Sequence, residues 1–419
     1  MFNEHLIINL LLILTVAWAL GALFVRVGLP IMLGELLAGI ILGPPLLGAV
    51  HSSPPLQFLA DLGIFFAMFY AGMEMDPREL VKHIWPSVAV AVGGFVVPFI
   101  LGYFVCRLFG GTLYQSLFVG MGLSVTAIAV QAVILQNMRV HTTRIGHIII
   151  GAAIADDILS LVTLSMLLGL AKSGTIEITG VLVIVLKVVL FFGFTILVGH
   201  FVVPRFTRKL QDYDGKGFTF ALISALLMAG AAEAAGLHLV IGAFLAGQFV
   251  RKEIMDEKIY HAIGDRFFGL SYGFLMPVFF ASLAFHLHFV WDPHFIVFAA
   301  AITAVAMIGK FAGAGLGARF FGHTLRESMV VGVGMNGRGA VELVIAAVVV
   351  KLSNDLMADG TIIEPLLTQE QFSALVLMAF VTTLITPILL KNSVAWSCSG
   401  KEKEAFCELW EKSSQKGPR

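Results

Sequence analysis

Long apolar runs separated by short polar segments dominate this chain. A helix needs about 20 consecutive apolar residues to cross a bilayer, and thirteen runs reach or approach that length. They cover residues 6–25, 30–49, 56–75, 84–106, 112–137, 143–170, 178–203, 218–236, 238–252, 262–287, 293–318, 325–350 and 370–391. We therefore predict an all-α polytopic membrane protein, with a transmembrane domain over residues 1–394 and a short tail at 395–419.

The basic residues of the loops predict the orientation. If the N-terminus lies outside, 21 of the 27 Lys and Arg residues fall in the inner loops and the tail. The outer loops then carry only Arg107, Lys172 and Lys351. The positive-inside rule favours this arrangement, which predicts an outer N-terminus, a cytoplasmic C-terminus and an odd number of spans. The N-terminal segment 1–5 lacks the basic residues of a signal peptide, so we expect the first helix to be retained.

Composition excludes several classes of protein. Only 13% of the residues are charged and the formal net charge is zero, so we expect no nucleic-acid partner. The three cysteines have neither metal-ligand nor CxxC spacing. His286 and His288 are two positions apart and do not share a helical face, which argues against a haem or zinc site. We expect no cofactor.

Two adjacent carboxylates lie in the middle of the apolar run 143–170. A charged side chain at the centre of a membrane helix costs about 2.5–3.5 kcal/mol on insertion scales. Asp156 and Asp157 have no basic residue beside them in the sequence. We predict that at least one of them binds or relays an ion; the alternative is a structural pair satisfied by neighbouring helices. An intramembrane aspartyl protease needs its two carboxylates on separate spans, so we do not expect an enzyme.

Three basic residues lie inside predicted spans. Lys187 has a simple explanation as a snorkelling or structurally paired side chain. Lys310 is too far from either end of its span to snorkel, and the acidic pair is its best available partner. Arg338 lies in the segment 332–342, which holds four glycines and two charges. Such a segment indicates a helix broken inside the protein, where it lines a cavity.

The fifth span has a milder irregularity. Ser124, Thr126 and Gln131 follow two glycines there, although Ser and Thr also join membrane helices without any other role. The glycine-rich twelfth span comes seven spans after this element, and because seven is odd, the two cross the membrane in opposite directions. Paired interrupted spans point to a secondary transporter with inverted repeats. We predict repeats of six helices, spans 1–6 and 8–13, with span 7 between them.

Several motifs, taken together and in order, carry a resemblance to a known family. They lie at residues 29–30, 34–44, 69–74, 155–157, 242–247, 277–280 and 337–342. The sequence resembles the cation:proton antiporter-2 family over residues 5–394, and within it the Nap-type sodium/proton antiporters. The resemblance implies thirteen helices, with two broken helices that cross near the midplane. It also implies a homodimer, with a scaffold at 1–75 and 218–287, a moving core at 84–170 and 293–391, and a linker helix at 178–203.

The resemblance also implies roles for particular residues. Asp156 and Asp157 would bind Na⁺ and protons, and Lys310 would pair with Asp156. Thr126 would lie at the helix crossing. Glu342 would compensate the charges of the helix ends at this crossing, and Arg338 and Ser124 would lie at the crossing as well.

The expected function is exchange of Na⁺ or Li⁺ for protons across the bacterial inner membrane, by alternating access of an elevator type. Exchange is electrogenic if Lys310 also gives up a proton. K⁺/H⁺ exchange is the alternative, because nothing in the acidic pair or Lys310 sets the radius of the cation. A cation channel is the alternative from another class, and the paired broken helices favour a carrier over it. The sequence leaves open the proton stoichiometry, the pH profile, the regulation and which aspartate has which role.

Overall fold

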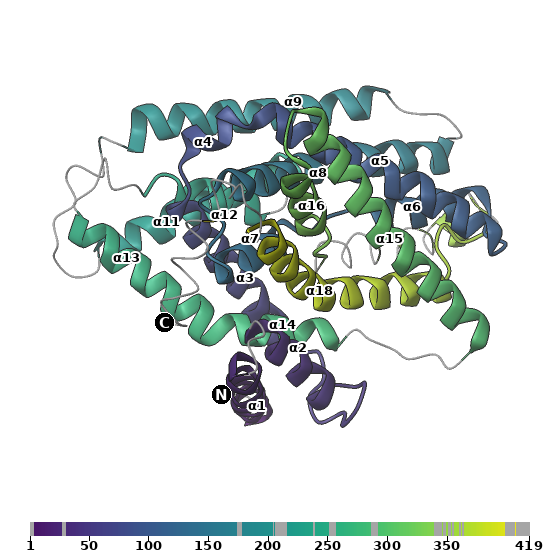
Figure 1. Cartoon of the computed structure of the whole chain (residues 1–419), viewed down its shortest axis with the longest axis horizontal. Coiled ribbons are helices and arrows are strands. Elements are labelled where there is room, and N and C mark those ends of the chain that lie inside the picture. The colour runs from purple at the N-terminus through teal and green to yellow at the C-terminus, as the bar shows by residue number, and fades with distance from the viewer. Residues whose placement is uncertain are drawn as a thin grey trace. The chain divides into compact units, whose positions relative to one another are not determined.

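The described part of the chain is helical and contains no strand (Figure 1). In this computed structural model the described residues are 4–26, 31–173, 178–203, 205, 216–237, 239–250, 257–285, 292–338, 346, 349–350, 353, 356–359, 362, 364–398 and 407. Their helices agree with the all-α class predicted from the apolar runs.

The helices have the following bounds. They are α1 (Glu4–Arg26), α2 (Ile31–Leu42), α3 (Pro54–Glu74), α4 (Pro77–Lys82), α5 (Ile84–Leu108), α6 (Leu113–Ser124), α7 (Ile128–Asn137), α8 (Arg144–Ser173), α9 (Ile178–Leu197), α11 (Lys216–Ala234), α12 (Leu239–Gly247), α13 (Glu257–Leu270), α14 (Met276–Ala284), α15 (Pro293–Phe320), α16 (Leu325–Gly334) and α18 (Gln369–Cys398). Two π-helical turns, η1 (Val198–Val202) and η2 (Ser271–Leu275), continue α9 and join α13 to α14.

Nine helical segments of the described residues are long and apolar enough to cross a membrane. The predicted span 112–137 is not among them, because it consists of the two short helices α6 and α7. The predicted span 238–252 contains a nine-residue helix, α12. The predicted span 325–350 lies partly outside the described residues. The count of thirteen therefore stays a prediction.

The chain divides into two compact units. One comprises residues 1–78 and 184–286, and the other comprises residues 79–183 and 287–419. In the first unit α3 packs against α12 so closely that a Cβ atom on Gly72 would lie 1.9 Å from the Phe244 carbonyl oxygen. In the second unit the most extensive helix pair is α5 with α15.

Glycines bring α5 and α15 into backbone contact. Gly309, Gly313 and Gly317 recur every four residues and so share one face of α15. A Cβ atom on Gly313 would lie 2.1 Å from the Gly93 carbonyl oxygen, and one on Gly317 would lie 2.4 Å from the Ala89 carbonyl oxygen. Small residues at such spacing let membrane helices approach closely. The contact fixes α15, which carries Lys310, against α5.

One sequence motif occurs twice in this second unit. Residues 107–124 and 319–336 are identical at nine of eighteen positions, at a constant offset of 212. Both copies contain an Arg, a Phe-Gly pair, a Thr-Leu pair, a Ser and a Val-Gly-x-Gly segment. Each copy covers the end of a long helix (α5 or α15), a short loop and a short helix (α6 or α16).

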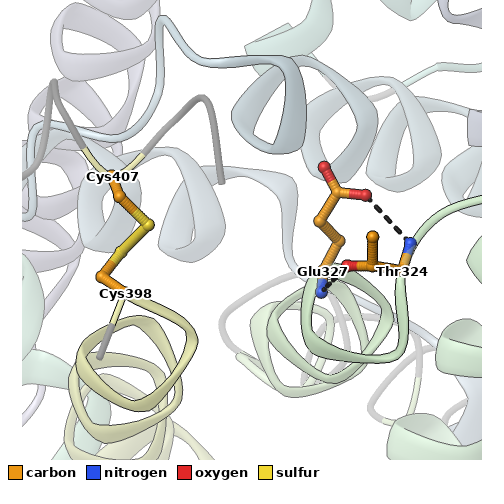
Figure 2. The surroundings of a disulfide bond; sticks show 4 residues. All are labelled: Thr324, Glu327, Cys398 and Cys407. Carbon is orange, nitrogen blue, oxygen red and sulfur yellow. Dashed lines mark hydrogen bonds between the residues drawn. A yellow bond between two sulfur atoms is a disulfide. The ribbon is translucent and has the colours of Figure 1, made fainter. Parts of the chain in front are cut away.

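The two copies have the same local structure. Arg107 and Arg319 each donate through Nη1, at 2.8 Å, to the carbonyl four residues later. Gly110 and Gly322 follow with φ of 84° and 81°, a backbone conformation that glycine adopts without strain. A capping box then starts each short helix: Thr112 with Gln115, and Thr324 with Glu327. Figure 2 shows the second of these boxes. The shared sequence therefore encodes a shared helix–loop–helix geometry.

A disulfide links the end of α18 to the tail. It joins Cys398 to Cys407, with 5.4 Å between the Cα atoms (Figure 2). Cys106 is buried and its thiol is free. The spacing of the cysteines did not predict the pair, because connectivity cannot be deduced from spacing alone.

Replacement of Gly313 by Val should destabilise the protein. The added side chain must separate α5 from α15, and overpacking of this kind typically costs about 1–3 kcal/mol. We expect a lower thermal midpoint of the detergent-solubilised protein, measured by fluorescence-detected size exclusion after heating. Gly193→Val in α9 is the matched control, since a Cβ atom there meets nothing within 4 Å. Equal losses in the two variants would contradict the close contact.

Candidate functional site

The first element of the site is the interruption between α6 and α7. Both Val125 and Ala127 have extended backbone, so no helix continues through residues 125–127. A helix end leaves its last four carbonyls without intrahelical partners. Inside a bilayer no bulk water is available to satisfy them. Other groups of the protein must therefore reach the end of α6.

The second element is the segment that follows α16. After α16 ends at Gly334, residues 335–338 form a turn and a short irregular stretch. Ala127 N–H and the Gln131 side-chain amide both donate to the Gly337 carbonyl, at 3.3 and 2.9 Å. The interruptions in the fifth and twelfth predicted spans therefore meet each other. Glu342, expected to compensate charge here, lies outside the described residues.

Arg338 satisfies most of the carbonyls at the C-terminal end of α6. Its guanidinium is fully buried and donates through Nη1 to the carbonyls of Gly122 and Val125, each at 3.0 Å. Nη2 donates to the carbonyl of Leu123. A positive charge at a helix C-terminus also opposes the negative end of the helix dipole. Arg338 thus acts as a C-terminal cap supplied by another element.

Thr383 of α18 holds the backbone of this cap. Its hydroxyl oxygen accepts from Arg338 N–H at 3.2 Å, and its hydroxyl donates to the Arg338 carbonyl. The irregular segment after α16 is thereby tied to a continuous helix.

Lys310 completes the cap and connects it to the acidic pair. From α15 its ammonium donates to the Ser124 carbonyl and lies 3.2 Å from Asp156 Oδ2 and 3.3 Å from Oδ1. Lys310 and Asp156 are both fully buried. Each of the four consecutive carbonyls 122–125 therefore accepts a hydrogen bond from a cationic side chain. Lys310, which lies too deep in its span to reach the membrane surface, therefore has Asp156 as an acidic partner.

The two aspartates have different surroundings. Adjacent residues of a helix point about 100° apart, and only Asp156 reaches Lys310. The Asp157 carboxylate is buried as well, but neither of its oxygens accepts a hydrogen bond from a described residue. A buried carboxylate without donors is costly unless it is protonated or binds a cation. Asp157 is therefore the freer of the two groups.

The two hydroxyls singled out in the fifth span also differ. Thr126 Oγ1 is buried beside the Asp156 carboxylate, outside ordinary hydrogen-bond geometry. The Ser124 hydroxyl instead donates to the Gly120 carbonyl of its own helix at 2.9 Å. Ser124 therefore reaches Lys310 through its backbone carbonyl, whereas Thr126 places its hydroxyl beside the Asp156 carboxylate.

Two amide side chains belong to this region and were not predicted as site residues. Gln131 and Asn336 are buried, and their side-chain oxygens accept no hydrogen bond from the described residues. The Asn336 amide donates back to Gly332, as Ser124 does to Gly120. The offset of 212 pairs Asn336 with Ser124, and this repeat is the signal that could have identified it. Hard cations prefer oxygen ligands, and carboxylate, hydroxyl and amide oxygens are all present here.

Replacement of Arg338 by Gln should destabilise the protein strongly. The change leaves up to three buried carbonyls without a donor, and each buried acceptor left unsatisfied costs about 1–3 kcal/mol. We expect a large fall in the thermal midpoint, and Lys at this position should restore only part of it because it lacks the planar fork. Arg107→Gln is the control, since Arg107 donates to a single, partly buried carbonyl. A smaller loss in the Arg338 variant than in the control would contradict the capping role.

Comparisons with known proteins agree on one family. A family model described as "Sodium/hydrogen exchanger, transmembrane" matches residues 10–396. The probable Na⁺/H⁺ antiporter GerT of Bacillus cereus is 34% identical over 92% of this chain and 98% of its own length. The Na⁺/H⁺-K⁺ antiporter GerN of the same organism is 33% identical over 88% of this chain and 92% of its own length.

A solved structure supports the fold. The sodium proton antiporter MjNhaP1 of Methanocaldococcus jannaschii aligns over 98% of this chain and 99% of its own, with a TM-score of 0.62. Its sequence identity is 17%, so this likeness concerns the fold alone.

Proposed function

Because this chain belongs to the sodium/hydrogen exchanger family, we propose that it exchanges Na⁺ or Li⁺ for protons across the bacterial inner membrane. The family consists of multi-pass membrane transporters, and relatives named Na⁺/H⁺ antiporters cover almost the whole chain. The observation that carries the proposal is the buried Asp156–Lys310 pair with Asp157 beside it, at the meeting point of two interrupted elements.

Competition for the same carboxylates is the proposed mechanism. Asp157 binds either a proton or the cation, because its oxygens are not engaged by described donors. Thr126, backbone carbonyls and water are candidate further ligands for Na⁺. Two neighbouring carboxylates titrate as a coupled pair, so a change at Asp157 alters the balance between Asp156 and Lys310.

A second proton is proposed to travel on Lys310. When Na⁺ enters, it weakens the attraction between Asp156 and Lys310, and the lysine releases its proton. Two protons then move for each Na⁺, so one net charge crosses the membrane in each cycle. The buried ion pair, 3.2 Å long, supports this coupling.

Alternating access is proposed to follow an elevator scheme in a homodimer. All the described residues of the candidate site belong to the unit formed by residues 79–183 and 287–419. The proposed moving core, residues 84–170 and 293–391, lies within this unit and would move against a scaffold formed from 1–75 and 218–287. The motif shared by residues 107–124 and 319–336 supports two inverted six-helix repeats within thirteen spans, with the N-terminus outside and the C-terminus in the cytoplasm.

K⁺/H⁺ exchange is the second candidate function. The name of the relative GerN includes K⁺ beside Na⁺. Neither the acidic pair nor Lys310 fixes the radius of the cation, so transport measured with Na⁺, Li⁺ and K⁺ distinguishes the two functions.

Replacement of Asp157 by Asn should abolish exchange. The amide cannot carry the proton or the negative charge for which the two ions compete. We expect proton flux in proteoliposomes to fall to the level of empty liposomes with Na⁺, Li⁺ and K⁺, while the wild type shows which cation drives it. Asp61→Asn is the control, since Asp61 is an exposed carboxylate of α3. Full exchange by the Asp157 variant would overturn the proposed mechanism.

Replacement of Lys310 by Gln should lower the proton stoichiometry. Without a releasable proton at this position, one proton should exchange for each Na⁺, and the exchange should become electroneutral, so its equilibrium should no longer depend on the membrane potential. Lys310→Arg makes a sharper test, because an arginine keeps the charge but does not deprotonate in proteins. Lys187→Gln, in exposed α9, is the control. An unchanged reversal potential in folded, active Lys310 variants would reject the second-proton step.

A further inference from the structure

Three side chains with metal-binding groups gather away from the ion site, at the start of two helices. Asp292 and His294 begin α15, and Glu370 lies in the first turn of α18. One potential ligand atom from each lies within 4.8 Å of the others. We propose that these three residues form a binding site for a divalent transition-metal ion such as Zn²⁺.

The spacing of the ligand atoms suits such an ion. His294 Nδ1 lies 3.3 Å from Glu370 Oε1. Ligands held about 2.0–2.1 Å from zinc at tetrahedral angles are about 3.3–3.4 Å apart. The ligand atom of Asp292 lies within 4.8 Å of the other two. Three protein ligands leave a fourth position for water, which is the pattern of an open zinc site.

Neighbouring groups orient two of the ligands. Asp292 caps α15, and its Oδ2 accepts from Phe295 N–H at 3.1 Å, so its other oxygen remains for a metal. The Phe109 ring packs against the His294 imidazole at 5.6 Å between centroids, in an edge-on arrangement. Contacts that orient the residues bound directly to a metal raise the affinity of the site for that metal.

The three side chains suit a bound transition-metal ion better than a simple ion pair between His294 and Glu370. The carboxylates of Asp292 and Glu370 repel each other, and a divalent cation between them removes that repulsion. An imidazole ligand suits Zn²⁺, Cu²⁺ or Ni²⁺, whereas Mg²⁺ and Ca²⁺ prefer sites made of oxygen. His261 and Glu257 form a comparable exposed pair at 3.7 Å, but no third ligand joins them among the described residues.

The site is separate from the proposed Na⁺ and proton site. Lys310 lies sixteen positions after His294 in α15, a distance of about 24 Å along the helix. The inference therefore stands independently of the transport mechanism. A bound metal would join the first turns of α15 and α18, two helices that carry Lys310 and Thr383 into the candidate site.

Zinc titration of the purified full chain tests the proposal. The protein should carry no histidine tag and should be stripped with EDTA before isothermal titration calorimetry. We expect one Zn²⁺ per chain and at least a roughly tenfold loss of affinity in His294→Gln and Glu370→Gln, since removal of even an outer-shell partner costs about 10–100-fold. Asp292→Asn should weaken binding likewise while it keeps the helix cap, because Asn caps as well as Asp.

The thermal midpoint supplies a second readout. A ligand that binds only the folded state raises the midpoint, so Zn²⁺ should raise it in the wild type, EDTA should reverse the rise, and His294→Gln should abolish it. His261→Gln is the matched control and should behave as the wild type. The proposal is overturned if the wild type binds no Zn²⁺ at about 100 µM, if His294→Gln binds as tightly as the wild type, or if His261→Gln loses as much affinity.

Discussion

Four backbone carbonyls at the end of a half-helix impose the constraint on which this site depends. A helix that stops inside a bilayer leaves carbonyls that no water of the hydrocarbon region can satisfy. Here Arg338 donates to three of them and Lys310 to the fourth. Both cations must therefore be buried, although each burial is costly unless the charge is paired.

This arrangement makes the Asp156–Lys310 pair part of the helix cap. The same ammonium serves the Ser124 carbonyl and the carboxylate, so the end of α6 responds to any change in charge at Asp156. The glycine face of α15 lies against the α5 backbone. This close packing fixes the position of α15 and leaves Lys310 little freedom to move away from Asp156. Helix packing and charge pairing therefore both determine the position of Lys310.

The sequence predicted the charged parts of the site better than its backbone parts. Lys310, Asp156 and Asp157 stand out because a charge inside an apolar run has few explanations. The partners of Arg338 could not be predicted, since they are carbonyl oxygens that no residue type reveals. The glycines near Arg338 did predict an interruption, but its position after Gly334 depends on tertiary contacts with Gln131 and Thr383. The Cys398–Cys407 disulfide was missed for a similar reason, because the approach of the tail to α18 leaves no local pattern.

The two copies of the repeated motif differ in one side-chain contact. Its first copy carries Gly111 and Gln115, which do not ionise, whereas the second carries His323 and Glu327 at the same two positions. In the second copy the imidazole Nδ1 lies 3.2 Å from the carboxylate Oε2, and the histidine is fully buried. The second loop is therefore held by a buried imidazole–carboxylate contact that Gly111 and Gln115 cannot form in the first. Two copies with the same backbone geometry thus differ in side-chain chemistry, so a substitution at His323 or Glu327 has no counterpart in the first copy.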